Sequence, residues 1–305
     1  MINPEKQTSW GWPIAGYLFL AGVGGSTFLF SFIFNILDLY EPVARLGTLI
    51  GPILVLIGTV FLLFDLGSVG KTYLLFSTVS RLKSSWMSKG SWILALFIIF
   101  GLLYSLPAFG AFSWLPWSMN TGAGLTIGII GALLAVFTVA YPGFLLGVAK
   151  GVPFWNTPVL PPLFFLSGLD TGLALLVLLA LFSASGVGVE IYHIIGAGDI
   201  ALIIMVLIVL AAYIEITRQS NIITGASVHM LKTPIFIVGV LLIGLIIPLC
   251  LLIYSVFTTD TLLIRILAGL SGICILVGGA LLRYSVIKVG IPITLLGSFP
   301  LPVKT

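Results

Sequence analysis

Charge is the scarcest property of this sequence. Only 7% of its 305 residues are Asp, Glu, Lys or Arg, while 60% are hydrophobic and the mean hydropathy is +1.27. Soluble domains carry roughly 25% charged residues. The composition therefore excludes a water-soluble fold. We expect an integral membrane protein that is surrounded by the lipid bilayer and does not bind nucleic acid.

Histidine and cysteine are also scarce, with two residues of each. His193 and His229 lie at or beyond the ends of apolar runs, so they cannot hold a haem between helices. Cys250 and Cys274 lie deep inside apolar runs, which excludes an iron–sulfur cluster and a disulfide framework. Glycine-rich nucleotide loops are missing too. We therefore expect no haem, no iron–sulfur cluster and no other metal site in this chain.

Long apolar runs are what the sequence has in abundance. A transmembrane helix needs about 20 apolar residues, and these runs are continuous rather than alternating, which excludes barrel strands. They predict an all-α polytopic membrane protein with eight transmembrane helices in helical bundles, and residues 1–305 as a single integral membrane domain. The first run is long enough to remain a helix rather than a cleaved signal peptide. The spans are expected at Pro13–Leu37, Val43–Phe64, Trp92–Leu106, Gly122–Leu146, Leu160–Phe182, Ile194–Ile216, Pro234–Phe257 and Leu262–Ile287.

Basic residues are distributed unequally between the two sides of the predicted bundle. With eight spans, both termini and the second-to-third, fourth-to-fifth and sixth-to-seventh connections share a side. Of the 13 Lys and Arg residues, all but Arg45 and Arg265 lie on that side. The positive-inside rule places this basic side in the cytoplasm, and the protein in the inner (cytoplasmic) membrane. A dock for an acidic partner subunit would produce the same asymmetry, and the sequence does not separate the two causes.

Two connectors on the basic side combine lysines with aromatic residues, the mixture that protein interfaces favour. The first, Gly67–Ser91, includes an amphipathic piece that is either interfacial or a solvated loop with aromatic anchors. The second, Val148–Pro158, is made rigid by prolines. We expect the end of the first connector, Ser84–Ser91, and the second connector to form a docking surface through Lys83, Trp86, Lys89, Lys150, Phe154 and Trp155.

The chemistry of a membrane protein concentrates on the few polar groups at or near membrane depth. One set converges on the basic side: Asp65, Tyr141, Trp12, Tyr17 and Arg283. A carboxylate, phenols and aromatic walls suit a quinone, whose flat ring needs apolar walls and whose carbonyls need donors that exchange protons. The alternatives are a helix-end ion pair of Asp65 with Lys71 or Arg283, and an interfacial belt for the tyrosine and the tryptophans.

A second polar set lies deeper and towards the opposite side. Asp170 is the most deeply placed carboxylate, and Asp199 and His193 lie near the start of the sixth span. If the helices bring Asp170 and Asp199 together, these residues form part of a proton path between the two faces. The alternative is a structural pair of carboxylates hydrogen-bonded to Ser or Thr hydroxyls inside the bundle.

Five motifs, in order along almost the whole chain, resemble the NrfD/PsrC family, the quinone-binding membrane subunits of polysulfide, nitrite and related respiratory reductases. They are WPIAGYLFLAGVGGS, LIGPILVLIGTVFLLFDLG, SSWMSKGSW, AYPGFLLGVAKGVPFWNTPVLPPLFFLSG and GGALLRYSVIKVG. The resemblance implies an eight-helix subunit without haem, which oxidises menaquinol or ubiquinol. It also implies a multi-cluster iron–sulfur partner, often with a molybdopterin catalytic subunit.

The resemblance also assigns individual roles. Tyr141 matches the tyrosine that the family associates with a quinone carbonyl, although here Pro142 follows it instead of Thr-Gly. Asp65 matches the acidic residue of the family's Asp-Leu-Gly motif, which implies a proton acceptor. The first span lacks the histidine that polysulfide reductases carry near its start, so Trp12 or Tyr17 would line that wall.

The sequence thus predicts a membrane subunit that exchanges electrons between quinone and a peripheral iron–sulfur subunit, with coupled proton release or uptake, and that is not catalytic alone. A competing hypothesis is a secondary transporter, based on the Gly51-Pro52 and Tyr141-Pro142 pairs and on Asp170. The third hypothesis is a purely structural membrane anchor.

Overall fold

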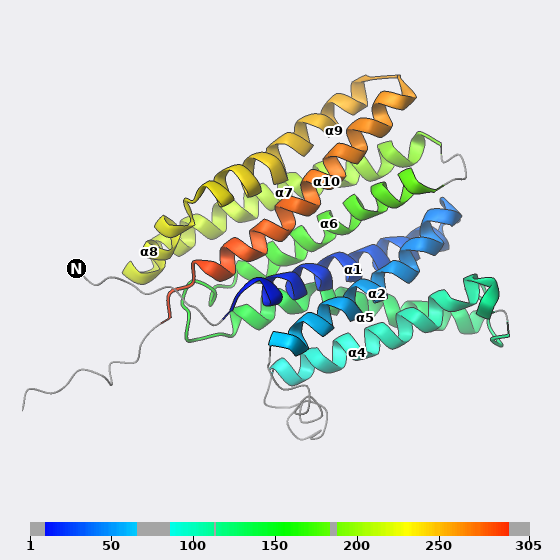
Figure 1. Ribbon diagram of the computed structural model, residues 1–305, viewed down its shortest axis with the longest axis horizontal. Helices are drawn as coiled ribbons and strands as arrows, with labels where there is room; N and C mark the ends of the chain where they lie inside the picture. The colour runs from blue at the N-terminus through cyan, green and yellow to red at the C-terminus, as the bar shows by residue number, and fades with distance from the viewer. Residues whose placement is uncertain (1–9, 66–85, 113, 184–187, 293–305) are drawn as a thin grey trace, which may run out of the picture.

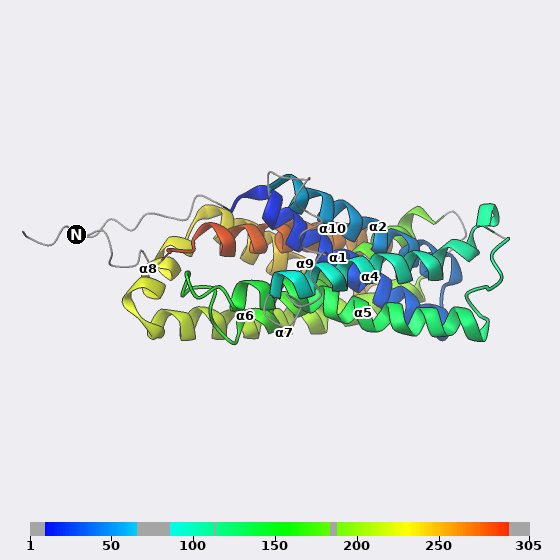
Figure 2. The ribbon, with the colours of Figure 1, turned by 90° about the horizontal axis from the view of Figure 1, so that it is seen from below.

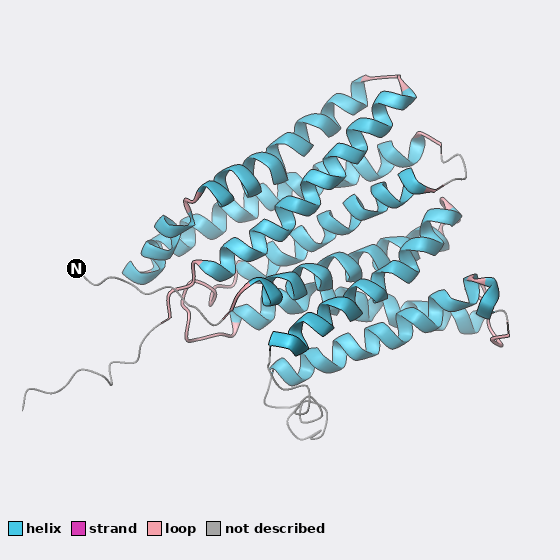
Figure 3. Ribbon diagram, viewed as in Figure 1, coloured by secondary structure: helices cyan, strands magenta, loops and turns pink. Residues whose placement is uncertain are grey.

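The computed structural model describes residues 10–65, 86–112, 114–183 and 188–292. Within these ranges every regular element is a helix (Figure 3), and eight helices are long and apolar enough to cross a membrane. The prediction of an all-α, multi-pass membrane protein is confirmed. The elements are α1 (Trp12–Ile36), α2 (Glu41–Asp65), α4 (Trp86–Ser105), η3 (Leu106–Ala108), η4 (Gly110–Phe112), α5 (Gly122–Gly147), α6 (Leu160–Phe182), α7 (Glu190–Ser220), α8 (Ile222–Leu231), η5 (Ile235–Ile246), α9 (Ile247–Phe257) and α10 (Thr261–Lys288).

The long helices form two groups that lie side by side, and consecutive helices within each group run antiparallel (Figures 1 and 2). One group contains α1, α2, α4 and α5, and the other contains α6, α7, η5 with α9, and α10. Helices α1 and α6 join the groups, because α1 packs on both α5 and α6, and α6 packs on α5, α7 and α10. They are also the most buried spans, with 72% and 67% of their apolar windows buried.

Glycines allow the closest helix crossings. A Cβ atom on Gly24 of α1 would lie 2.5 Å from the carbonyl oxygen of Gly51 on α2, and one on Gly51 would lie 2.6 Å from that of Gly24. A Cβ atom on Gly244 of η5 would lie 2.5 Å from the Cα atom of Gly278 on α10. Such backbone contact is how membrane helices gain van der Waals packing without a hydrophobic driving force between them.

Three features of the helices differ most clearly from the sequence prediction. Helix α4 begins at Trp86 rather than Trp92, so the end of the predicted interfacial connector continues into the span. The seventh span divides into a π-helix and an α-helix shortly before Pro248, whose missing N–H interrupts the regular hydrogen-bond ladder. Helix α8 was expected as a connector, but Asn221 and Thr224 form a capping box that starts a helix there.

One end of the molecule gathers the segments that the sequence singled out. Helices α1, α4 and α6 begin there, and α2, α5 and α10 end there (Figure 1). We call this the basic end.

Candidate functional site

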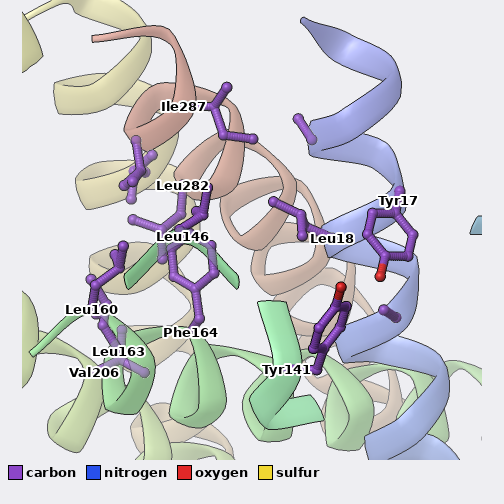
Figure 4. Close-up of a cluster of buried hydrophobic side chains, with 14 of the residues drawn as sticks. Tyr17, Leu18, Tyr141, Leu146, Leu160, Leu163, Phe164, Val206, Leu282 and Ile287 are labelled. Atoms are coloured by element: carbon purple, nitrogen blue, oxygen red, sulfur yellow. The ribbon is translucent and has the colours of Figure 1, made fainter. Parts of the chain in front are cut away.

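Two buried tyrosines face each other near the basic end. Tyr17 of α1 is 0% exposed and Tyr141 of α5 is 5% exposed. Figure 4 shows their hydroxyl groups pointing towards one another across the space between the two helices. Each residue lies five or six positions inside its helix end, roughly 7–9 Å along the helix axis. A contact between two phenols uses one O–H proton, so the pair keeps a second proton for an acceptor such as a carbonyl.

Glycines of α2 and α4 contact the two tyrosines at different points, α2 at the backbone of Tyr17 and α4 at the ring of Tyr141. A Cβ atom on Gly58 of α2 would lie 3.4 Å from the carbonyl oxygen of Tyr17. On α4, a Cβ atom at Gly90 would overlap the ring of Tyr141. Asp65, the predicted proton acceptor, is the last residue of α2, roughly 10 Å along the helix from Gly58. Its side chain lies outside the part of the chain that the structure describes.

Trp12 is separate from the tyrosine pair. Its indole is 55% exposed and stacks on Tyr284 of α10, with ring centroids 4.1 Å apart. This position, half exposed at the end of the first span, is the one that an interfacial belt residue occupies. The structure therefore favours the belt alternative for Trp12, and leaves Tyr17 as the residue of α1 that faces Tyr141.

Arg283 was predicted to belong to the same site, but the structure places it between the two helix groups. Its guanidinium is buried (1% exposed), with its carbon 5.7 Å from the ring centre of Phe19 and 5.6 Å from that of Phe164. It donates hydrogen bonds to the carbonyl oxygens of Leu18 (3.3 Å) and Gly279 (2.8 Å) and to the hydroxyl of Ser167 (3.2 Å). Its hydrogen bonds thus join α10 to α1 and α6.

Asp170 and Asp199 lie in the second group, close enough to interact electrostatically with each other, and Asp170 also interacts with Arg283. Both aspartates are buried, and Asp170 Oδ1 and both carboxylate oxygens of Asp199 have no hydrogen-bond partner among the described residues. The structural alternative required hydroxyl partners, and these three atoms lack them. His193 is half-buried near the start of α7, six residues before Asp199.

A small cavity adjoins Asp170. It measures about 10 Å³, roughly the space that one water molecule needs. Ser167 and Asp170 of α6 line it together with residues of α7, η5 and α10. The cavity gives the unpartnered Asp170 oxygen room for a water.

The predicted docking residues fall into two classes. Trp86 is 44% exposed, stacks on Phe144 of α5 with ring centroids 5.9 Å apart, and lies 4.9 Å beneath the Lys89 ammonium. Lys150 is exposed on the connector between α5 and α6. An open groove of about 370 Å³ lies beside it, lined by Phe144, Gly147, Val148, Asn156, Thr157, Pro158, Pro161 and Pro162. Lys83 lies outside the described residues.

Phe154 and Trp155 differ from the expectation, because both are buried, at 1% and 3% exposed. The Trp155 indole N–H donates to the carbonyl oxygen of Val286 on α10 (2.9 Å), and its ring stacks on Trp10. The Tyr213 hydroxyl of α7 donates to the carbonyl oxygen of Phe154 (2.7 Å). These aromatics attach the connector to its own bundle and are not available to a partner. The composition of the connector indicated that Phe154 and Trp155 lie at an interface. Whether such side chains are buried depends on helices that are distant in the sequence, here α7 and α10.

Two residues near these sites were missed at the sequence level. Ser167 lies three positions before Asp170 on α6, a spacing that places both on one helix face and that could have been noticed. Gly90 touches Tyr141 from another helix, and nothing in the local sequence indicates that contact.

Comparison with known proteins gives a consistent set of relatives. The family model described as "Polysulphide reductase, NrfD" matches residues 1–294. The C subunit of polysulfide reductase from Wolinella succinogenes is 32% identical over 213 residues, covering 64% of this sequence and 66% of that protein. Protein NrfD from Escherichia coli is 30% identical over 187 residues, covering 54% of this sequence and 57% of that protein. A NrfD homologue from Haemophilus influenzae is 25% identical over 278 residues, covering 83% and 85%. The match thus spans less than two thirds of the length of the first two relatives.

Proposed function

We propose, because the chain belongs to the NrfD family (polysulphide reductase, NrfD), that it is the quinone-binding membrane subunit of a respiratory oxidoreductase. It exchanges electrons between a menaquinone or ubiquinone in the membrane and a peripheral iron–sulfur subunit, with a molybdopterin subunit as the catalytic partner. The name of the Wolinella relative, one subunit of polysulfide reductase, supports a role within a multi-subunit complex. In this role the subunit is not an enzyme by itself.

The observation that carries the proposal is the buried pair of phenols near the basic end. A quinone carbonyl is a neutral acceptor, and the spare O–H proton of Tyr17 or Tyr141 is a matching donor in a site where water does not compete. Both tyrosines belong to one cluster of buried hydrophobic side chains, which also contains Leu18 and Phe164. An apolar wall with few polar groups is the usual form of a small-molecule site.

The proposed reaction removes two electrons and two protons from a quinol. The quinol hydroxyls lose their protons as the ring is oxidised to a quinone, and the electrons pass to the clusters of the iron–sulfur subunit. Tyr141 holds the oxygen of the ring. Asp65, at the end of α2, accepts the two protons one after the other and releases each to water at the basic end, and quinone reduction follows the reverse order.

Removing single hydroxyls tests this site. Tyr141→Phe and Tyr17→Phe should each raise the KM for quinol in the intact complex by roughly fivefold to tenfold, the effect of losing one hydrogen bond to substrate. Tyr104→Phe is the matched control, because that buried hydroxyl accepts a hydrogen bond from Asn35 (2.8 Å) at the opposite end of the same helix group. If Tyr141→Phe keeps the wild-type KM, or if Tyr104→Phe raises the KM as much, the tyrosine pair does not bind quinone as proposed.

We further propose that Asp170, Asp199 and His193 carry protons between the two faces. Arg283 supplies one positive charge to an interior that holds two carboxylates. Because an uncompensated buried charge is costly, one carboxylate of the pair must hold a proton or another cation. The cavity beside Asp170 has room for one water molecule, to which that carboxyl can pass a proton.

Proteoliposomes that contain the complex separate this role from electron transfer. Asp199→Asn should keep quinol oxidation within about twofold of wild type while reducing the number of protons moved per electron, because the path and the quinone site use different residues. Glu190→Gln, an exposed carboxylate at the start of the same helix, is the control. An unchanged proton-to-electron ratio in Asp199→Asn would contradict the path.

A further inference from the structure

We propose that Gly90 is a positioning residue for Tyr141. Its missing side chain leaves the space on α4 that the tyrosine ring occupies, so that the hydroxyl faces Tyr17. The inference rests on the proposed role of Tyr141 in holding quinone, and it adds a residue from a third helix to that site.

The contact is close, and both residues are buried. Gly90 is buried, and a Cβ atom there would overlap the ring carbons and the hydroxyl oxygen of Tyr141. Tyr141 is itself 5% exposed, and Tyr17 lies across from its hydroxyl (Figure 4). A side chain at position 90 must therefore turn the ring away from Tyr17 or move α4 away from α5.

A second contact holds the same turn of α4 in place. Trp86, one turn before Gly90, stacks on Phe144, which lies three residues after Tyr141 on α5, and the two rings are within 9° of parallel. Residues 86 and 90 share one face of α4, and residues 141 and 144 share one face of α5. Because the stack fixes α4 against α5, a new Cβ atom at position 90 acts first on the tyrosine ring.

The chemical consequence is a misdirected hydroxyl. Hydrogen bonds weaken steeply when the donor–hydrogen–acceptor angle falls below about 120°, so a turned Tyr141 loses its hold on a quinone oxygen while the fold persists. Alanine is also the better helix former, which means that a glycine at this position of α4 has no local advantage. The contact with Tyr141 is the physical reason for it.

Steady-state kinetics of the complete complex, with a short-tailed quinol as substrate, test the proposal. Gly90→Ala should raise the KM for quinol by roughly fivefold, as expected for the loss of one hydrogen bond. Gly128→Ala is the matched control, because a Cβ atom there would meet the rings of Phe32 and Tyr104 at the opposite end of the same helix group. An equal effect from both variants would mean a general packing defect and would overturn the proposal.

A double-mutant cycle identifies Tyr141 as the residue through which Gly90 acts. In the Tyr141→Phe background, Gly90→Ala should have almost no further effect on KM, because the hydroxyl it misdirects is already missing. If Tyr141→Phe raises KM and Gly90→Ala does not, the positioning role fails while the proposed quinone site stands. If Tyr141→Phe leaves KM unchanged, both proposals fail.

A variant that does not assemble also gives an answer. Should Gly90→Ala prevent assembly, Tyr141→Leu in the same chain removes the ring that the new Cβ atom meets. Assembly restored by Tyr141→Leu would support the contact, and failure of that rescue would overturn it.

Discussion

Buried tyrosines in this protein differ in what their hydroxyls face. The Tyr213 hydroxyl donates to the Phe154 carbonyl oxygen, and the Tyr104 hydroxyl accepts from Asn35. Tyr17 and Tyr141 face each other instead (Figure 4). Two groups that can both donate and accept do not use up each other's capacity. At the scale of single residues, this pair therefore keeps one O–H proton for an outside acceptor.

Asp65 gives a prediction at the same scale. Asp65→Asn keeps the size of the side chain but removes the proton acceptor, so quinol turnover should fall by about 100-fold while the complex still assembles. The measurement is kcat for quinol oxidation, with assembly followed by co-purification of the partner subunits. Wild-type turnover would refute the role of Asp65 and leave a helix-end ion pair as its explanation.

Arg283 and Ser167 show what residue-level sequence reading misses. The arginine was assigned to the basic end because it is near the end of the last span, but its long side chain extends inward to α1 and α6. Position along a helix gives the depth of a Cα atom, but the charged end of an arginine lies up to a whole side-chain length away from it. The hydrogen bonds of Arg283 depend on which helices are neighbours, and one sequence does not contain that information.

At the scale of elements, the connector between α5 and α6 is a rigid surface attached to its own bundle. The buried residues Phe154 and Trp155 attach the connector to α7 and α10, and Lys150 remains exposed beside the groove. Lys89 and Trp86 extend this surface across Phe144 to the first turn of α4. We propose that this surface is the dock for the iron–sulfur subunit, and its rigidity limits the entropy lost on binding.

Charge reversal tests the dock. The double variant Lys89→Glu and Lys150→Glu should release the iron–sulfur subunit at a lower salt concentration than wild type, because rim charges act through screened attraction. Co-purification across a salt series measures the effect, and Arg265→Glu, exposed at the opposite end, is the control. If the double variant retains its partner at moderate salt as wild type does, the dock lies elsewhere, and the basic residues serve only as a topology signal.

Element boundaries were predictable where hydrophobicity alone decides them and not where backbone bonding does. The eight spans follow from apolar runs of sufficient length, and the structure has a helix at each of them. The π-helical turn pattern of η5 and the extra helix α8 depend on hydrogen-bond register and on a capping box. Each of these features depends on a few backbone and side-chain hydrogen bonds, which the hydrophobicity of a run does not predict.

At the scale of the whole molecule, two helix groups separate two kinds of polar chemistry. The tyrosine pair lies in the group of α1, α2, α4 and α5, near the basic end. The Asp170 and Asp199 pair lies in the group of α6, α7 and α10, beside Arg283. Helix α1 contributes to both, through Tyr17 in the first site and the Leu18 carbonyl in the second. The sequence drew attention to both sets of polar residues, but it assigned Arg283 to the tyrosine set, because the separation into two groups follows from helix neighbours.

The location of quinone is the central claim, and photolabelling measures it most directly. A quinone analogue with an azide on its ring, irradiated in membranes that contain the complex, should attach to peptides of α1 near Tyr17 and of α5 near Tyr141. An excess of unlabelled quinol should abolish this labelling. Labelling that excess quinol abolishes, but that falls on peptides around Asp170 of α6 or Ile275 of α10, would contradict the account.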